Sequence, residues 1–225
     1  MVCLAQLCAG YWDRIDLLYV FAQRSTAGAK INWVNPGTFT ATDDHSTTFI
    51  KYQGFDGNGS STHLESNYIP SVNANHISQN STAVGSWVIS DMDVADITIG
   101  GKDVTGGYRI GLFPKSDGNM RGLINSNDAA VSVNASSVGL SMSARTAADL
   151  ITNYMNGVSL GTGTDASIGL PTVELYLLAE NADGTAASYF DGIISIEILM
   201  DGVVDQTEAT KIYNIFHRYM TRIGQ

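Results

Sequence analysis

The hydrophobic pattern of the chain changes period near its C-terminus, and two predicted elements follow from that change. Apolar and polar residues alternate over residues 193–200, with Ser195 and Glu197 lying between Ile194, Ile196, Ile198 and Met200. A period of two predicts a strand that buries one face. After Asp201-Gly202 the apolar positions recur in steps of three and four, at Ala209, Ile212, Phe216, Tyr219 and Ile223. Those steps predict a helix over residues 205–223.

Both ends of this predicted helix carry sequence signals. Asp205, followed three residues later by Glu208, is a capping-box pattern with Asp in the Ser/Thr position. Gly224 stands where helices commonly end, because glycine tolerates the left-handed conformation that closes them. We therefore expect the chain to finish in a strand, a turn and one short helix.

Short apolar segments separated by turn residues fill most of the remaining chain. Turn signals include Asp117-Gly118-Asn119, Asn156-Gly157 and Asp56-Gly57-Asn58-Gly59. Strands at intervals of roughly 8–12 residues, without helices between them, favour an antiparallel sandwich or barrel over a parallel α/β sheet. The predicted strands are residues 47–53, 63–69, 83–90, 108–113, 120–125, 138–144, 150–155, 173–179 and 193–200.

The first part of the chain has a different pattern. Apolar residues recur at helical spacing at Leu4, Leu7, Tyr11 or Trp12, Ile15, Leu18 and Ala22. This spacing predicts one amphipathic helix within residues 1–24, followed by the main domain in residues 25–225. The helix either packs on the main domain or exposes an apolar side that docks on another protein. A secretion signal is not expected, because the segment has neither a basic start nor a small-residue cleavage pattern.

Composition and charge agree with one sizeable β-rich domain. The chain has 225 residues, 23 of them glycine, and 15% are charged, which suits many short strands and turns. Its formal net charge is −10 and no Lys/Arg cluster occurs, which argues against a nucleic-acid partner. No apolar run approaches the ~20 residues of a membrane span, so membrane insertion is not expected.

Residue types that bind metals are present but scattered. Cys3 and Cys8 are expected to be reduced thiols packed as small apolar groups. The four histidines are spread over the chain without ligand spacing, so the sequence predicts no zinc site. Asp56-Gly57-Asn58-Gly59 lacks the further carboxylates of an EF-hand, and a plain turn is the favoured interpretation, with loop calcium left open. The histidines are His45, His63, His76 and His217.

Several segments in order resemble a known fold family. FDGIISIEILMDGVVDQTEATKIY (residues 190–213) resembles the close of concanavalin A-like, or laminin G-like, jelly-roll domains. The segments GYWDRIDLLYVFA, INWVNPGT, QGFDGNGSSTHLESNYIPS, NSTAVGSWVIS, NYMNGVSLGT and LYLLAENADG, in that order, resemble a branch found in tailed-bacteriophage structural proteins. The resemblance spans nearly the whole chain.

This resemblance implies an all-β concanavalin A-like jelly-roll sandwich of two antiparallel sheets, with an N-terminal helix and a short C-terminal helix. It also implies a non-enzymatic virion protein, such as a decoration, fibre or tail component of a phage particle. Other virion proteins, further copies of the chain in a homo-oligomer, and a host cell-surface glycan are the partners that this setting implies.

One acidic run invites a catalytic interpretation. Asp91, Asp93 and Asp96 reproduce the carboxylate spacing of jelly-roll glycoside hydrolases, which carry paired glutamates around an aspartate on one strand. Glycoside hydrolysis with retention needs two carboxyl groups about 5–5.5 Å apart. Aspartate is shorter than glutamate and the run follows a strand, so a solvated acidic loop is favoured. No catalytic residue is predicted.

A carbohydrate site needs flat aromatic faces beside planar polar groups in a shallow groove. Each candidate residue has a structural alternative: Trp87 alternates with core residues, and Asn125 and Asn127 suit a turn. The alternative function is a glycan-active enzyme or a free lectin on the same fold. The predicted carbohydrate-binding residues are Trp87, Tyr108, Arg109, Asn125, Asn127 and Tyr176.

Overall fold

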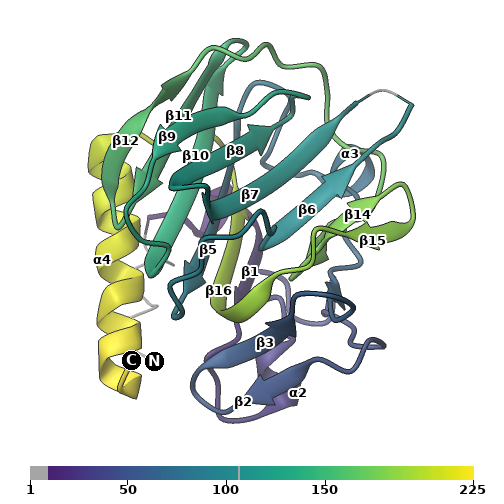
Figure 1. Cartoon of the computed structure of the whole chain (residues 1–225), viewed down its shortest axis with the longest axis vertical. Coiled ribbons are helices and arrows are strands. Elements are labelled where there is room, and N and C mark those ends of the chain that lie inside the picture. The colour runs from purple at the N-terminus through teal and green to yellow at the C-terminus, as the bar shows by residue number, and fades with distance from the viewer. Residues whose placement is uncertain (1–9, 106) are drawn as a thin grey trace.

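The computed structural model describes residues 10–105 and 107–225, which form two packed β-sheets with one long helix against the outside of the first sheet (Figure 1). In the first sheet, called sheet A, all paired strands are antiparallel, and β1 also pairs with β16. The order in sheet A is β12 (Val158–Gly163), β11 (Leu150–Met155), β10 (Gly139–Ala147), β5 (Thr82–Val88), β16 (Asp191–Met200), β3 (Gly54–Asn58) and β2 (Thr48–Ile50), with β1 (Ile15–Val20) beside β16.

The second sheet, called sheet B, is antiparallel except for the parallel pair β14–β6. Two short strands, β4 (Leu64–Glu65) and β13 (Tyr176–Leu177), continue it at one edge, where β13 pairs with both β4 and β6. The main order is β15 (Thr185–Ala187), β14 (Glu180–Ala182), β6 (Ile99–Lys102), β7 (Arg109–Ser116), β8 (Asn119–Ile124) and β9 (Ala130–Val133).

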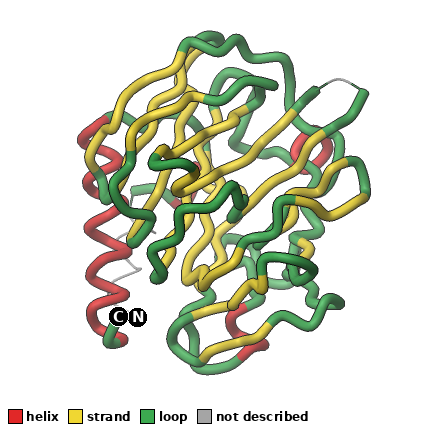
Figure 2. Tube along the Cα trace, viewed as in Figure 1, coloured by secondary structure: helices red, strands yellow, loops and turns green. Residues whose placement is uncertain are grey.

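The helices are few and lie outside the sheets (Figure 2). A 3₁₀ turn, η1 (Trp12–Arg14), precedes β1, and α2 (Thr26–Ala29) and α3 (Pro70–Asn73) are single turns in loops. The long helix α4 (Gln206–Ile223) confirms the predicted C-terminal helix. Its N-cap Asp205 accepts a 2.8 Å hydrogen bond from the Glu208 backbone N–H, and Gly224 closes it with φ 89°.

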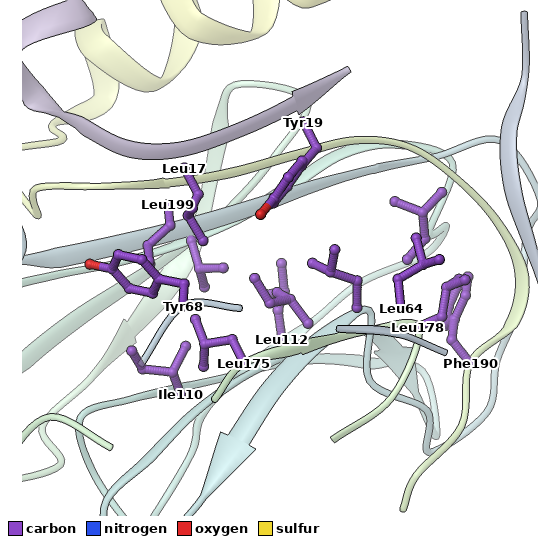
Figure 3. Packing of buried hydrophobic residues seen from close by; sticks show 14 of the residues in the cluster. Leu17, Tyr19, Leu64, Tyr68, Ile110, Leu112, Leu175, Leu178, Phe190 and Leu199 are labelled. Atoms are coloured by element: carbon purple, nitrogen blue, oxygen red, sulfur yellow. The ribbon is translucent and has the colours of Figure 1, made fainter. Parts of the chain in front are cut away.

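The main hydrophobic core lies between the two sheets. Tyr19, Leu112, Leu178 and Phe190 come from both sheets and from the loops beside them, and their side chains meet in this layer (Figure 3). Burial of apolar area at about 25 cal/mol per Å² is the main stabilising contribution of such a layer. The prediction of an antiparallel two-layer sandwich is confirmed.

A second apolar layer lies between sheet A and α4. Ile196, Ile198 and Met200 of β16 face Ile212 and Phe216 of the helix within this layer. Sheet A therefore has apolar neighbours on both sides, whereas the outer side of sheet B has no covering helix among the described residues (Figure 1). This difference leaves the outer face of sheet B as the available sheet surface.

The expected N-terminal helix is wrong over the part that the structure describes. Residues 15–20 form β1, which pairs with β16 through Leu18–Ile198 and Val20–Ile196. Leu17 and Tyr19 enter the layer between the sheets, while Ile15, Leu18 and Val20 face the α4 layer. A strand with both faces buried is apolar throughout, so its residues also match helical spacing by chance. Residues 1–9, including Cys3 and Cys8, lie outside the described residues.

The strand at residues 193–200 is confirmed, but the expectation of one buried face is wrong. Both faces are buried: Glu197 is 1% exposed inside the sandwich, and Ile196 and Ile198 lie under α4. A register shift between Ile194 and Ile196 turns Ile194 into the main core, away from its alternating partners. The bulge explains why strict alternation did not assign the faces correctly.

Most other predicted strands and turns are confirmed with shifted ends, but residues 63–69 and 173–179 hold only the two-residue strands β4 and β13. The turns at Asp117-Gly118 and Asn156-Gly157 join β7 to β8 and β11 to β12, with positive φ at all four residues. The expected turn at residues 56–59 is wrong, because residues 56–58 belong to β3 and the chain turns after them. A Cβ on Gly57 would lie 2.0 Å from the Phe190 carbonyl oxygen, so the glycine serves close strand packing.

Among the described helices, none combines the length and the apolar character needed to cross a membrane.

Candidate functional site

The candidate site is a pocket at the edge of sheet B where β4 and β13 pair. Its cavity volume is about 370 Å³. The residues that line it come from the loop before β2, from β4 and β13, from the β14–β15 hairpin and from the segment after it. They are His45, His63, Glu65, Tyr176, Gly184, Thr185, Ala186 and Tyr189.

Strand pairing positions the centre of this pocket. Tyr176 on β13 lies opposite Glu65 on β4 and opposite Gly100 on β6. The neighbouring residues Leu64 and Leu177 point into the main core. Because side chains alternate along a strand, Glu65 and Tyr176 point to the outer face.

Aromatic rings form a stack along one wall of the pocket. The His63 ring lies between the His45 and Tyr176 rings, with centroid separations of 3.7 Å and 4.5 Å. The Tyr189 ring lies 6.1 Å from His63 at a tilt of 54°. His63 and Tyr176 are buried, Tyr189 is half-buried and His45 is exposed. Most of the exposed ring surface at this pocket therefore belongs to His45 and Tyr189.

The polar groups of the pocket form few hydrogen bonds with the rest of the protein. The Glu65 carboxylate accepts a 3.3 Å hydrogen bond from the Thr42 hydroxyl, and its Oε1 lies 3.8 Å from His45 Nε2. Nδ1 of His63 is buried and has no hydrogen-bond partner among the described residues. Burial, reinforced by the neighbouring His45, lowers the pKa of His63, and this outweighs the opposing effects of Glu65 and the Ser61 backbone. Burial also raises the pKa of Tyr176, with Glu65 adding to the effect.

The structure separates the six residues predicted to bind carbohydrate. Only Tyr176 lines the pocket. Arg109, at the start of β7, pairs with Glu180 of β14 and lies with its guanidinium carbon 5.8 Å from the Phe113 ring centroid. This ion pair lies on the outer face of sheet B beside Gly100, one strand from Tyr176.

Tyr108 and Asn127 are near each other at one end of sheet B. A Cβ on Gly107 would lie 3.3 Å from the Asn127 side chain, and one on Gly169 would lie 2.9 Å from the Tyr108 ring. Tyr108 is half-buried and Asn127 is exposed. These two residues form a second polar and aromatic surface.

Trp87 and Asn125 have structural contacts that account for their burial. The Trp87 ring stacks on Tyr213 of α4 with centroids 5.9 Å apart and interplanar angle 5°. The Asn125 side-chain amide donates to the Ser78 and Gln79 carbonyls and to the Thr82 hydroxyl. Carbohydrate binding by the six residues stays a prediction.

The acidic run lies in the loop between β5 and β6. Asp91 accepts a 2.8 Å hydrogen bond from the Ser137 backbone N–H, which lowers the pKa of Asp91, and Lys115 lies 3.6 Å away. Asp93 accepts from the Gly118 N–H at 2.9 Å. Burial raises the pKa of Asp96. Asp91 and Asp93 therefore fasten this loop to neighbouring turns.

A larger cavity of about 560 Å³ lies at the start of α4. The one basic group among its described lining residues is already paired: the Arg14 guanidinium donates to Glu208 of the cavity wall at 2.7 Å and to Asp201 beside it. These bonds join β1, the end of β16 and α4. The unpartnered imidazole nitrogen therefore distinguishes the smaller pocket as the better candidate for a ligand site.

Sequence reasoning missed His45, His63, Glu65 and Tyr189. His63 and Glu65 are two residues apart, a spacing that places both side chains on the same face of a strand, and the sequence alone could have indicated this. His45 and Tyr189 come from distant segments, and only tertiary packing brings them there.

Comparisons with known proteins support the fold. No family model matches the chain, and no curated protein matches it in sequence. Domain 4 of AbnA, an extracellular arabinanase of Geobacillus stearothermophilus, solved in complex with arabinotriose, has TM-score 0.57 and 18% identity over 89% of this chain and 98% of that chain.

Two further solved structures are longer than this chain, which matches only part of each. The binding domain of botulinum neurotoxin serotype D has TM-score 0.60 and 9% identity over 90% of this chain and 52% of its own. A Trypanosoma rangeli sialidase variant has TM-score 0.55 and 14% identity over 82% and 30%, respectively. At these identities the likeness shows the fold alone, which is a concanavalin A-like jelly-roll sandwich with a C-terminal helix.

Proposed function

We propose that this chain is a non-catalytic carbohydrate-binding domain that binds glycan in the pocket around Tyr176 and Tyr189. The observation that carries the proposal is that stacked aromatic rings lie beside the Glu65 carboxylate on the sheet face that no described helix covers. Ring faces suit the C–H side of a sugar, and planar polar groups suit its hydroxyls. Tyr176 belongs to the residues predicted from the sequence.

The chemistry of the pocket favours a neutral sugar over a charged one. Glu65 supplies a carboxylate acceptor, and Thr185 on the hairpin rim is an exposed residue with a hydroxyl. The cation of Arg109 on β7 forms an ion pair with Glu180. The chain as a whole carries a formal charge of −10, which disfavours polyanionic ligands.

The fold likeness supports the proposal without assigning a ligand. Domain 4 of the arabinanase, which this chain matches over nearly its full length, was solved with arabinotriose bound. Binding without turnover is the corresponding proposal here, because the acidic run is used in loop contacts and no catalytic carboxylate pair is assigned. A glycan-active enzyme on the same fold would instead show turnover of a polysaccharide.

A virion setting is the finer part of the proposal, and the sequence resemblance alone supports it. On that basis the chain is a decoration, fibre or tail component of a phage particle that contacts other virion proteins and is present as a homo-oligomer. Crosslinking followed by mass spectrometry of intact particles tests this part, because a virion component must yield reproducible crosslinks to other particle proteins. Absence of the chain from purified particles would remove the virion setting and leave the binding proposal standing.

A glycan array followed by titration calorimetry tests the binding proposal. The wild-type protein is expected to bind at least one neutral oligosaccharide, and Tyr189→Ala is expected to abolish that binding with the fold intact by circular dichroism. Tyr108→Ala is the matched control, since it removes a half-buried tyrosine from the second surface of the same sheet.

Each result of this comparison bears on the site. Loss of binding in the Tyr189 variant alone supports the pocket. Loss in the Tyr108 variant alone moves the site to the surface of Tyr108 and Asn127 and overturns the pocket assignment. A wild-type protein that binds no glycan would overturn the function.

A further inference from the structure

We propose that His45, His63 and Glu65 form a binding site for a divalent transition-metal ion, with zinc the best match. Each of the three residues offers one ligand atom, and these atoms all lie within 4.8 Å of one another. Nε2 of His45 lies 3.8 Å from Oε1 of Glu65. Ligand atoms bound to one zinc ion at about 2.0–2.2 Å each lie closer together than these atoms do, so binding requires them to approach one another.

The donor set selects the kind of metal. Two imidazoles and one carboxylate are the protein ligands of several zinc sites in which a fourth position stays open. Calcium and magnesium prefer sets made of oxygen ligands, so a site with two nitrogen donors disfavours them. The three residues line a cavity of about 370 Å³, where a water molecule or a ligand oxygen has room beside the metal.

Two of the three ligands are held in place before any metal arrives. The β4 residue Glu65 exchanges backbone hydrogen bonds with Thr42 at 2.9 and 3.0 Å, and its carboxylate accepts from the Thr42 hydroxyl. His63 is 3% exposed and its ring packs on Tyr176. Fixed ligands lose little conformational entropy on binding, which favours affinity.

His63 provides a second observation on this site. Its Nδ1 is buried without a hydrogen-bond partner among the described residues. Buried polar atoms are nearly always paired, and an exception points to a water, an ion or another ligand at the site. A nearly buried imidazole with an unpaired nitrogen, next to a second imidazole and a carboxylate, fits a metal ligand.

His45 is the ligand that must move. Its ring stacks on His63 with an interplanar angle of 22°. An imidazole binds metal through a nitrogen lone pair that lies in the ring plane, so two rings stacked face to face cannot both point at one ion. His45 is exposed and lies in the loop before β2, and its ring is able to tilt away from His63. Metal binding is therefore expected to separate the two rings.

Zinc titration of the metal-stripped full-length protein tests the proposal, with a chromophoric chelator as competitor. One zinc ion per chain is expected at this site. His45→Ala and Glu65→Gln should each weaken that binding by at least about tenfold, and calcium should not compete. His76→Ala is the matched control, because it removes a histidine outside the pocket. All variants are compared by circular dichroism, and His63 is left unchanged because it is buried.

Cys3 and Cys8 could also bind zinc, so the titration is repeated in the Cys3→Ser/Cys8→Ser background. Zinc binding that persists there and is lost on adding His45→Ala supports the site. Binding that disappears with the cysteines, or that His45→Ala and Glu65→Gln leave unchanged, overturns it, as does the absence of binding.

The metal site does not rest on carbohydrate binding. Tyr189→Ala should leave zinc stoichiometry unchanged, and the glycan titration is performed with and without zinc. Failure of one proposal therefore remains distinct from failure of the other. The location of the metal has its own readout: with Co²⁺ as a paramagnetic probe, the His45 and His63 ring resonances should shift most, and shifts centred elsewhere would contradict the site.

Discussion

The hydroxyl of Ser86 on β5 donates a 2.8 Å hydrogen bond to Oε2 of Glu197 on β16, in the space between the two sheets. The same hydroxyl lies 2.6 Å from the Thr98 hydroxyl, which precedes β6. A polar connection between the sheets therefore passes through a carboxyl group that is 1% exposed. Oε1 of Glu197 has no hydrogen-bond partner among the described residues. Burial raises the pKa of Glu197 well above its ordinary value, so the folded protein favours the protonated carboxyl.

Glu197 should make stability fall as pH rises. In the unfolded chain the glutamate ionises near pH 4.3, while the folded protein retains the proton to higher pH. Between these two pKa values the folded state binds more protons, so the free energy of unfolding decreases with rising pH. Below pH 4 the carboxyl is protonated in both states, and its favourable contribution to the free energy of unfolding is fully present. Urea unfolding of wild type and Glu197→Gln from pH 4 to 8 is expected to show a stability difference that increasingly favours the glutamine variant.

The matched control for this experiment is Asp128→Asn, which alters an exposed carboxylate. Its stability difference from wild type should stay nearly constant over the same pH range. A constant difference for Glu197→Gln as well would contradict the raised pKa.

Arg145 should be the most sensitive charged residue in the fold. Its side chain is 0% exposed and donates hydrogen bonds to the carbonyl oxygens of Ile124, Ala147, Ala148 and Asp165. A lysine cannot reproduce this fork of donors, and each buried carbonyl left unpaired costs about 1–3 kcal/mol. Arg145→Lys is expected to lower the free energy of unfolding by at least about 3 kcal/mol in chemical denaturation. Arg218→Lys on the exposed face of α4 should change it by less than about 0.5 kcal/mol.

The N-cap of α4 should contribute a measurable amount of stability. Asp205 accepts the Glu208 N–H, so Asp205→Ala leaves that donor without its side-chain partner. The expected loss is about 1 kcal/mol, which corresponds to a Tm lower by about 2–4 °C for a domain of this size. Asp205→Asn keeps an acceptor and should lose less in the same thermal scan. Equal losses for both variants would contradict a capping role.

Trp87 should act as a packing residue between sheet A and α4. Trp87→Ala removes the ring that stacks on Tyr213 and is expected to destabilise the protein by about 3–5 kcal/mol. Trp87→Phe keeps part of the contact and should cost less. Chemical denaturation measures both, and glycan binding of the folded Trp87→Phe protein should be unchanged. Loss of glycan affinity without loss of stability would instead place Trp87 in the binding site.

Local signals predicted most of the fold because strands alternate with a period of two and turns are marked by a few characteristic residues. Asn156-Gly157 joined β11 to β12 as expected, since both residues adopt positive φ. The errors occurred where a residue's neighbours come from distant segments. Leu17 and Leu18 match helical spacing, but β16 on one edge and apolar layers on both faces make them part of a strand.

The sequence pattern by itself determined an antiparallel sandwich or barrel and the capped helix α4, because hydrophobic period, turn residues and capping residues act over a few neighbouring positions. The choice of the sandwich came from the family resemblance. Only the tertiary structure decided that Trp87 lies beneath α4, that β1 is buried on both faces, and that His45, His63, Glu65 and Tyr189 share one pocket. Those relationships depend on strand order and register, which unite segments more than a hundred residues apart and leave no period in the sequence.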